Sequence, residues 1–200
     1  MAWSPYVVSA EEMGEVRGYP GPRGTEAVYA SIPHRRRLLD QYAGVVFFDS
    51  DNVVMPDAPD ICLEVTPDQP IGTEAACNCA VMVLLSCEKT KKMLDLIWDT
   101  RHGYAGTQWA EQAAYMDLMG FDPKYPGDNL PPVYLGDTEW TPLRANLSPG
   151  WNVHPYHPFP DPVLSIHPGG LQPFSHRLEV LKHYVAMSQL PDAVLAPWPR

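Results

Sequence analysis

The sequence predicts an α/β sandwich with a mainly parallel sheet, and three observations lead to this fold class. Short runs rich in β-branched and aromatic residues are typical of buried strands. They alternate with segments that have the apolar spacing of amphipathic helices, which favours parallel strands joined by helices. Polar residues suited to ligand binding follow two of the strands, at the edge where parallel sheets bind their ligands.

Composition limits the class of protein further. The chain has 200 residues, 45 % of them hydrophobic, so it can bury a substantial core. We expect a single domain over 1–200, with an irregular segment at 1–25 and the core at 26–190. A formal net charge of −10 argues against a nucleic-acid partner, because phosphate backbones attract basic surfaces. No signal-peptide pattern or long apolar run is found, which favours a cytoplasmic protein with no membrane span.

The expected elements follow from local patterns along the chain. Pro33 suits the first turn of a helix, where its missing N–H costs nothing, and Gly44 is placed to end that helix. A strand at 45–48 comes next. Further strands are expected at 60–65, 77–86, 133–135 and 163–166. Three further helices are expected to begin near Ser86, Thr107 and Ser175, which suit N-cap positions.

Two carboxylates, Asp49 and Asp51, directly follow the strand at 45–48. Residues two apart in an extended backbone point the same way, so both carboxylates can converge on one point beyond the strand. Converging carboxylates repel each other unless a cation or a proton lies between them. Oxygen ligands of this kind suit Mn²⁺ or Mg²⁺. An acidic turn without a ligand is the alternative for so short a motif.

Polar residues near two other strands are candidates for the same site. Asn78 lies in an otherwise apolar run, where a buried amide must find hydrogen-bond partners. His167 follows the strand at 163–166 and stands just before Gly169 and Gly170, whose backbone can approach a ligand closely. Each of these residues also has a purely structural explanation.

Glu111 and Gln112 form a further candidate pair at the start of an expected helix. The helix dipole favours negative charge at this end, so a carboxylate here is expected to be ionised. The same dipole is by itself a sufficient structural reason for Glu111. The pair therefore becomes a functional candidate only in combination with the other motifs.

Taken together, the motifs resemble retaining nucleotide-sugar glycosyltransferases of the GT-A fold, of the glycogenin-like and galactosyl, mannosyl or xylosyl transferase type. The matching motifs are Asp49-Ser50-Asp51, Asn78, Glu111-Gln112 and His167-Pro168-Gly169-Gly170. The resemblance runs from about Ala30 to Tyr184. It implies transfer of a hexosyl or pentosyl group from a nucleoside-diphosphate sugar to an acceptor hydroxyl, with retention of configuration. The acceptor is not identified by the sequence.

The resemblance also implies roles for individual residues. Asp49, Asp51 and His167 would hold the Mn²⁺ or Mg²⁺ ion that binds the donor diphosphate. Glu111 and Gln112 would act on the donor sugar in catalysis. The residues that would contribute further donor contacts are Ser50, Asn78, Gly169 and Gly170.

Three departures from the family pattern qualify these expectations. Ala80 stands where the family has a glycine two residues after the asparagine. Gln172 precedes Pro173-Phe174 where a basic residue is usual, so a clamp on the phosphates is expected to be lost. Only residues 1–29 precede the matching region, so the N-terminal nucleotide-binding unit is expected to be abbreviated or cut off.

Two other interpretations stay open. Phe47 to Val54 also resembles the opening motif of haloacid-dehalogenase-type phosphatases, in which the first aspartate is the nucleophile. Thr141 stands where the later acidic pair of that family would place its second aspartate after Asp137. The second interpretation is a catalytically degenerate transferase-like domain that binds a sugar or a partner without turnover.

Overall fold

The computed structural model describes a chain made of helices and short strands. The described residues are 25–74, 77–104, 106–107, 109–124, 132–169 and 174–190. The irregular segment predicted at 1–25 lies almost entirely outside them.

The described residues belong to two compact units. The helical unit takes in the residues up to 45 together with 85–142, and the sheet unit takes in 46–84 together with the residues from 143 on. The single domain over 1–200 stays a prediction.

A four-stranded sheet lies mostly within the sheet unit. Its strands, in spatial order, are β1 (Gly44–Phe48), β4 (Val81–Leu85), β3 (Ile71–Thr73) and β5 (Arg144–Asn146). Strand β3 pairs antiparallel with β4 and parallel with β5, so the sheet is mixed and not mainly parallel as the sequence predicted. The reason is the short link at 74–80 between β3 and β4, because a parallel crossover needs about a dozen residues or more. The broader prediction of an α/β fold is confirmed.

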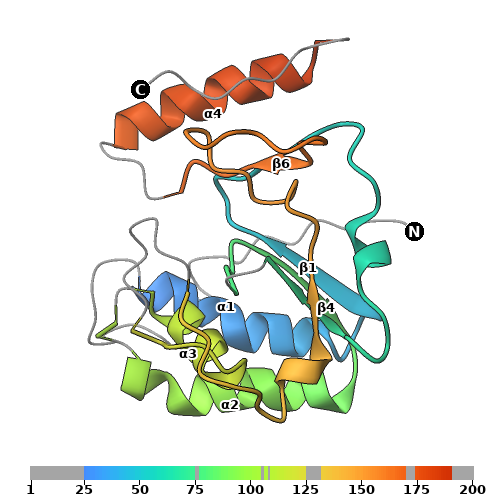
Figure 1. The fold of residues 1–200 in the computed structure, drawn as a ribbon, viewed down its shortest axis with the longest axis vertical. Helices are drawn as coiled ribbons and strands as arrows, with labels where there is room; N and C mark the ends of the chain where they lie inside the picture. The colour runs from blue at the N-terminus through green and yellow to red at the C-terminus, as the bar shows by residue number, and fades with distance from the viewer. Residues whose placement is uncertain are drawn as a thin grey trace. The chain divides into compact units, whose positions relative to one another are not determined.

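A second, two-stranded ribbon carries the last helix of the sheet unit. Strands β2 (Val53–Val54) and β6 (Ser165–Ile166) pair antiparallel, and α4 (Phe174–Ser188) packs against them (Figure 1). The buried residues of this small core are Val53, Met55, Ile166, Val180 and Tyr184. Because these apolar side chains leave water together, the ribbon and the helix are held in one arrangement.

Among the described residues, the helical unit contains three α-helices that lie side by side in Figure 1, namely α1 (Thr25–Leu38), α2 (Glu88–Tyr104) and α3 (Glu111–Leu118). Pro33 lies inside α1 and does not begin it, so the predicted start was wrong. Buried Tyr29 and Ile32 stabilise the helix through packing, despite the hydrogen bond that a proline removes. None of the helices in the described part of the chain has both the length and the apolar character needed to cross a bilayer.

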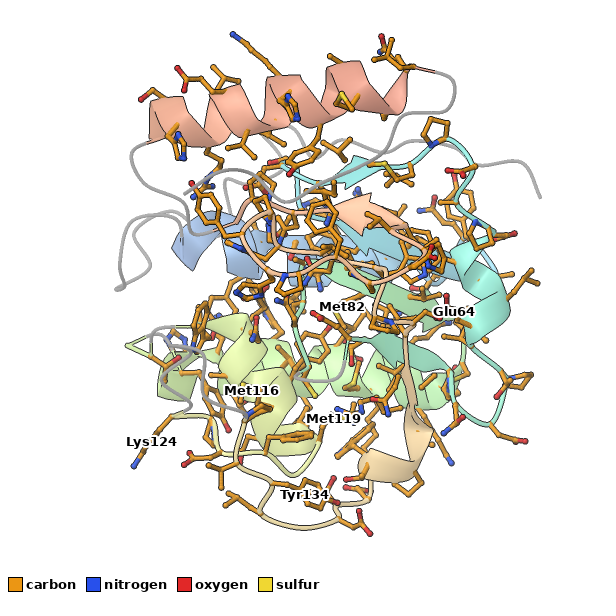
Figure 2. All side chains as sticks on the ribbon, turned by 45° about the horizontal axis from the view of Figure 1, so that its top comes forward. Glu64, Met82, Met116, Met119, Lys124 and Tyr134 are labelled. Carbon is orange, nitrogen blue, oxygen red and sulfur yellow. The ribbon has the colours of Figure 1, made fainter. Side chains whose placement is uncertain are left out.

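Local hydrogen bonds replace one predicted strand and shorten another. The strand expected at 60–65 is the 3₁₀ helix η2 (Ile61–Glu64), because the Asp60 carboxylate accepts a hydrogen bond from Cys62 N at 3.0 Å. Glu64, labelled in Figure 2, also accepts hydrogen bonds from Ser148 N and Trp151 Nε1. The strand expected at 77–86 begins only at residue 81 and ends at 85.

The remaining short segments are less regular than the sequence suggested. The strand expected at 133–135 is reduced to a bridge between Tyr134 and Phe121. A short 3₁₀ helix, η3 (Thr141–Leu143), leads into β5. Strand β1, expected to be fully buried, is half-buried along its whole length.

Candidate metal centre

Asp49, Asp51 and His167 come together in the sheet unit. One ligand atom from each lies within 4.8 Å of the other two, and no other group of three such side chains is found in the described residues. His167 Nε2 lies 3.1 Å from Asp51 Oδ1 and 3.5 Å from Asp49 Oδ2. The convergence predicted from the sequence is therefore observed, and the group has the composition and spacing to bind a metal ion.

Backbone pairing explains how residues so far apart in sequence meet. Asp49 follows β1, and its N–H donates to Ala80 O at 2.8 Å. A turn closed by Asn52 N donating to Asp49 O then leads into β2. Val53 of β2 stands opposite Ile166 of β6. In that antiparallel register, residues just before Val53 face residues just after Ile166, which brings the aspartate turn beside the histidine.

An arginine completes the cluster, and the sequence analysis missed it. Arg177 Nη1 lies 3.1 Å from Asp51 Oδ2. Arg177 lies on α4 about one turn before Val180, which is buried against the ribbon. The signal that could have revealed it is an arginine next to a buried position on the helix that follows the histidine loop.

The two aspartates differ in their surroundings. The side chain of Asp49 is 43 % exposed, while those of Asp51 and His167 are 16 % and 13 % exposed. Burial raises the pKa of the Asp51 carboxyl, but the hydrogen bond with His167 and the charges of His167 and Arg177 outweigh it. The net result is a pKa below the usual value. Asp51 is therefore the anchored carboxylate and Asp49 the one open to solvent.

Gly169 allows the histidine ring to lie where it does. A Cβ atom added at Gly169 would stand 2.4 Å from His167 Cε1, well inside van der Waals contact. A residue with a side chain would thus force the imidazole out of its present position. Gly169 therefore contributes to the geometry of the site, whereas Gly170 lies outside the described residues.

A buried polar layer lies next to β6, the strand that precedes His167. Asn152 N donates to Ser165 Oγ at 2.9 Å, and Asn152 Nδ2 donates to Glu74 Oε2 at 2.9 Å. Burial raises the pKa of Glu74, partly opposed by the Asn152 hydrogen bond and by the charges of His167 and His157. This carboxyl is thus close enough to His167 to sense its charge.

Asn78 and Ser50 have different places. Asn78 is in a turn before β4 and not in a buried strand, and its Oδ1 accepts from Ala80 N at 2.9 Å. Since Ala80 O accepts from Asp49 N, this turn supports the backbone of Asp49. Ser50 is exposed in the aspartate turn. Donor contacts by either residue stay predictions.

Glu111 and Gln112 belong to the helical unit and open α3. Glu111 is buried and lies 3.9 Å from Arg35 Nη2, which is also buried. Its Oε2 accepts a hydrogen bond from Gln112 N at 3.2 Å. The structure thus gives Glu111 a local partner, and its expected role on a donor sugar stays a prediction.

Comparison with known proteins adds no relative to this picture. No protein-family model, curated protein or solved structure matches the chain. The functional case therefore rests on the residues of the site themselves.

Proposed function

We propose that the protein is a metal-dependent glycosyltransferase with a GT-A-like site. It moves a hexosyl or pentosyl group from a nucleoside-diphosphate sugar to an acceptor hydroxyl. The observation that carries the proposal is the convergence of Asp49, Asp51 and His167 just after β1. The motifs that resemble retaining transferases support the same reaction and favour retention of the anomeric configuration.

The donor set fits a hard divalent cation. Asp49 and Asp51 offer carboxylate oxygens and His167 offers a ring nitrogen, a combination that suits Mn²⁺ and, less well, Mg²⁺. When bound, such a cation neutralises the charge that builds on a departing diphosphate. The two aspartates and the histidine would hold it, and Gly169 keeps the histidine ring in position for that task.

Glu111 and Gln112 are proposed to act on the donor sugar. Loss of the diphosphate leaves positive charge at the anomeric carbon, which a carboxylate or an amide oxygen can stabilise. Because this charge is fully developed only in the transition state, the pair should affect turnover more than donor binding.

The proposal is tested with the full chain and a panel of nucleoside-diphosphate sugars. Release of the nucleoside diphosphate is measured with Mn²⁺ and with EDTA. We expect release only with Mn²⁺ and its loss in Asp51→Asn. The matched control is Asp57→Asn, an exposed aspartate of the same unit, which should behave as the wild type.

The other interpretations predict different results in the same assay. Mn²⁺-dependent binding of a nucleotide sugar without release would indicate a degenerate, non-catalytic domain. Hydrolysis of p-nitrophenyl phosphate, lost in Asp49→Asn, would indicate a phosphatase. Normal turnover in Glu111→Ala and Gln112→Ala would remove those two residues from the mechanism.

A further inference from the structure

We propose that the positively charged side chain of Arg177 binds phosphate in this site. It pairs with Asp51 when no divalent cation is bound, and it turns to the phosphate oxygens of a metal-chelated diphosphate when Asp51 binds the cation. This inference rests on the proposed function and deepens it. It names a phosphate-binding residue that the sequence analysis did not find.

The contacts of Asp51 give the first reason. Its Oδ1 is close to His167 and its Oδ2 is close to Arg177, each at 3.1 Å. Asp51 thus contacts a candidate metal ligand through one oxygen and the arginine through the other. A divalent cation held by the two aspartates and the histidine would partly neutralise the negative charge of Asp51. The electrostatic attraction between Asp51 and Arg177 would then be weaker.

Charge balance gives the second reason. With a neutral histidine, a divalent cation beside Asp49 and Asp51 has its charge fully cancelled. Arg177 then supplies the one positive charge in excess among these groups. A diphosphate is negatively charged, so a site with a net positive charge attracts it more strongly than a neutral site does.

The chemistry and support of Arg177 give the third reason. A guanidinium group presents a planar set of N–H donors that matches two phosphate oxygens at once. Its side chain is 20 % exposed, so part of it can meet a ligand. Its helix is fixed by buried Val180 and Tyr184, so little freedom is lost when a ligand binds.

Calorimetry separates a phosphate-binding role from a purely structural one. Mn²⁺ is titrated alone, and inorganic pyrophosphate is then titrated at saturating Mn²⁺. The variants are Arg177→Gln and Arg177→Lys. The matched control is Lys182→Gln, which removes one positive charge at an exposed position of the same helix.

We expect Arg177→Gln to bind pyrophosphate about tenfold more weakly, because a charge-assisted, bidentate contact is lost. Mn²⁺ alone should bind it as well as the wild type or more tightly, since the cation no longer competes with Arg177 for Asp51. Arg177→Lys should keep part of the pyrophosphate affinity. Lys182→Gln should match the wild type in both titrations.

Two results would overturn the inference while leaving the proposed function intact. One is unchanged pyrophosphate affinity in Arg177→Gln. The other is weaker binding of Mn²⁺ alone with pyrophosphate affinity unaltered, which would make Arg177 a support for Asp51 only. Wild-type protein that binds Mn²⁺ but no pyrophosphate would also overturn it, and absence of Mn²⁺ binding would overturn both. Arg177-dependent pyrophosphate binding without turnover of any nucleotide sugar would uphold the inference and reject the proposed function.

Discussion

Glu111 in the helical unit and Asp51 in the sheet unit are both carboxylates paired with an arginine, but they are held differently. Glu111 lies 3.9 Å from Arg35, and both side chains are almost fully buried. Asp51 lies 3.1 Å from Arg177 and also 3.1 Å from His167. The first carboxylate lies beside one buried arginine, while the second belongs to a cluster with a histidine and another aspartate.

The difference concerns what balances the charge of each acid. Glu111 has Arg35 within the helical unit to balance its charge, and its proposed contact with a donor sugar would be additional. Asp51 shares His167 with a second carboxylate, Asp49, and two such charges repel each other. A divalent cation bound by both aspartates would remove that repulsion, which is why the cluster is a candidate metal site.

The largest effect is expected from breaking the buried pair of the helical unit. Arg35→Met should lower the free energy of unfolding by about 3 kcal/mol, because it leaves Glu111 buried without its base. Urea unfolding measures this change. The affinity for Mn²⁺ should stay at the wild-type value.

The matched control for that variant lies on the same helix. Arg36 makes exposed ion pairs with Asp40 at 2.9 Å and with Asp95 at 3.2 Å, so Arg36→Met should lower the free energy of unfolding much less than Arg35→Met. Equal losses in Arg35→Met and Arg36→Met would show that the buried pair has no special structural role. A drop in Mn²⁺ affinity in Arg35→Met would end the contrast between the two carboxylates.

The second prediction removes charge from the sheet unit. Asp51→Asn should weaken Mn²⁺ binding about 100-fold, or roughly 2.7 kcal/mol, because one of two anionic ligands is lost. Asp49→Asn should weaken it less, by about tenfold, since the more exposed carboxylate is better screened by water. Calorimetry at constant ionic strength measures both affinities. Equal effects of the two substitutions would contradict the distinction between the anchored and the open aspartate.

The third prediction tests the support of the histidine without touching any ligand. Gly169→Ala places a Cβ against the ring of His167 and should weaken Mn²⁺ binding about tenfold. Gly106→Ala is the control, because a Cβ there meets nothing within 4 Å. Unchanged affinity in Gly169→Ala would mean that the ring can shift and still bind the ion.

The sequence predicted the site better than the sheet that carries it. Asp49 and Asp51 were found because a strand that ends in two carboxylates is a local pattern. The meeting with His167 followed from the strand expected at 163–166, of which only Ser165–Ile166 is a strand. Its physical cause is the pairing of β2 with β6, two strands of two residues each, which are too short to recognise by periodicity.

The errors arose where side chains redirect the backbone. Asp60 binds Cys62 N and turns an apolar run into a 3₁₀ helix, and Asn78 binds Ala80 N and delays a strand. The apolar spacing of the last helix predicts Leu178, Leu181 and Val185 as its inner face. Leu181 packs against the small core, whereas Leu178 and Val185 are exposed and Val180 and Tyr184 are buried. The inner face is therefore only partly the expected one, and Arg177 lies near enough to it to reach Asp51.

The smallest effect, and the last prediction, concerns two acids of the sheet unit with opposite pKa shifts. Burial acts against ionised Asp51, but His167 and Arg177 hold its pKa below the usual 3.8. Because the pKa of Asp51 is lower in the folded protein than in the unfolded chain, ionised Asp51 stabilises the protein above about pH 4. This stabilisation is lost as the pH falls through the pKa that Asp51 has in the folded protein. Burial raises the pKa of Glu74 above the usual 4.5. The contribution of Glu74 to stability is therefore present at low pH and is lost as the pH rises through the pKa that Glu74 has in the folded protein.

Urea unfolding from pH 3 to pH 8 in EDTA distinguishes the two acids. Asp51→Asn should flatten the loss of stability below about pH 4, because the amide cannot take up the proton. Glu74→Gln should gain stability relative to the wild type as the pH rises above about 5, because the buried group no longer ionises. A parallel pH profile for wild type and Asp51→Asn would mean that His167 and Arg177 do not stabilise the Asp51 carboxylate. It would also remove the electrostatic basis for treating Asp51 as the anchored ligand.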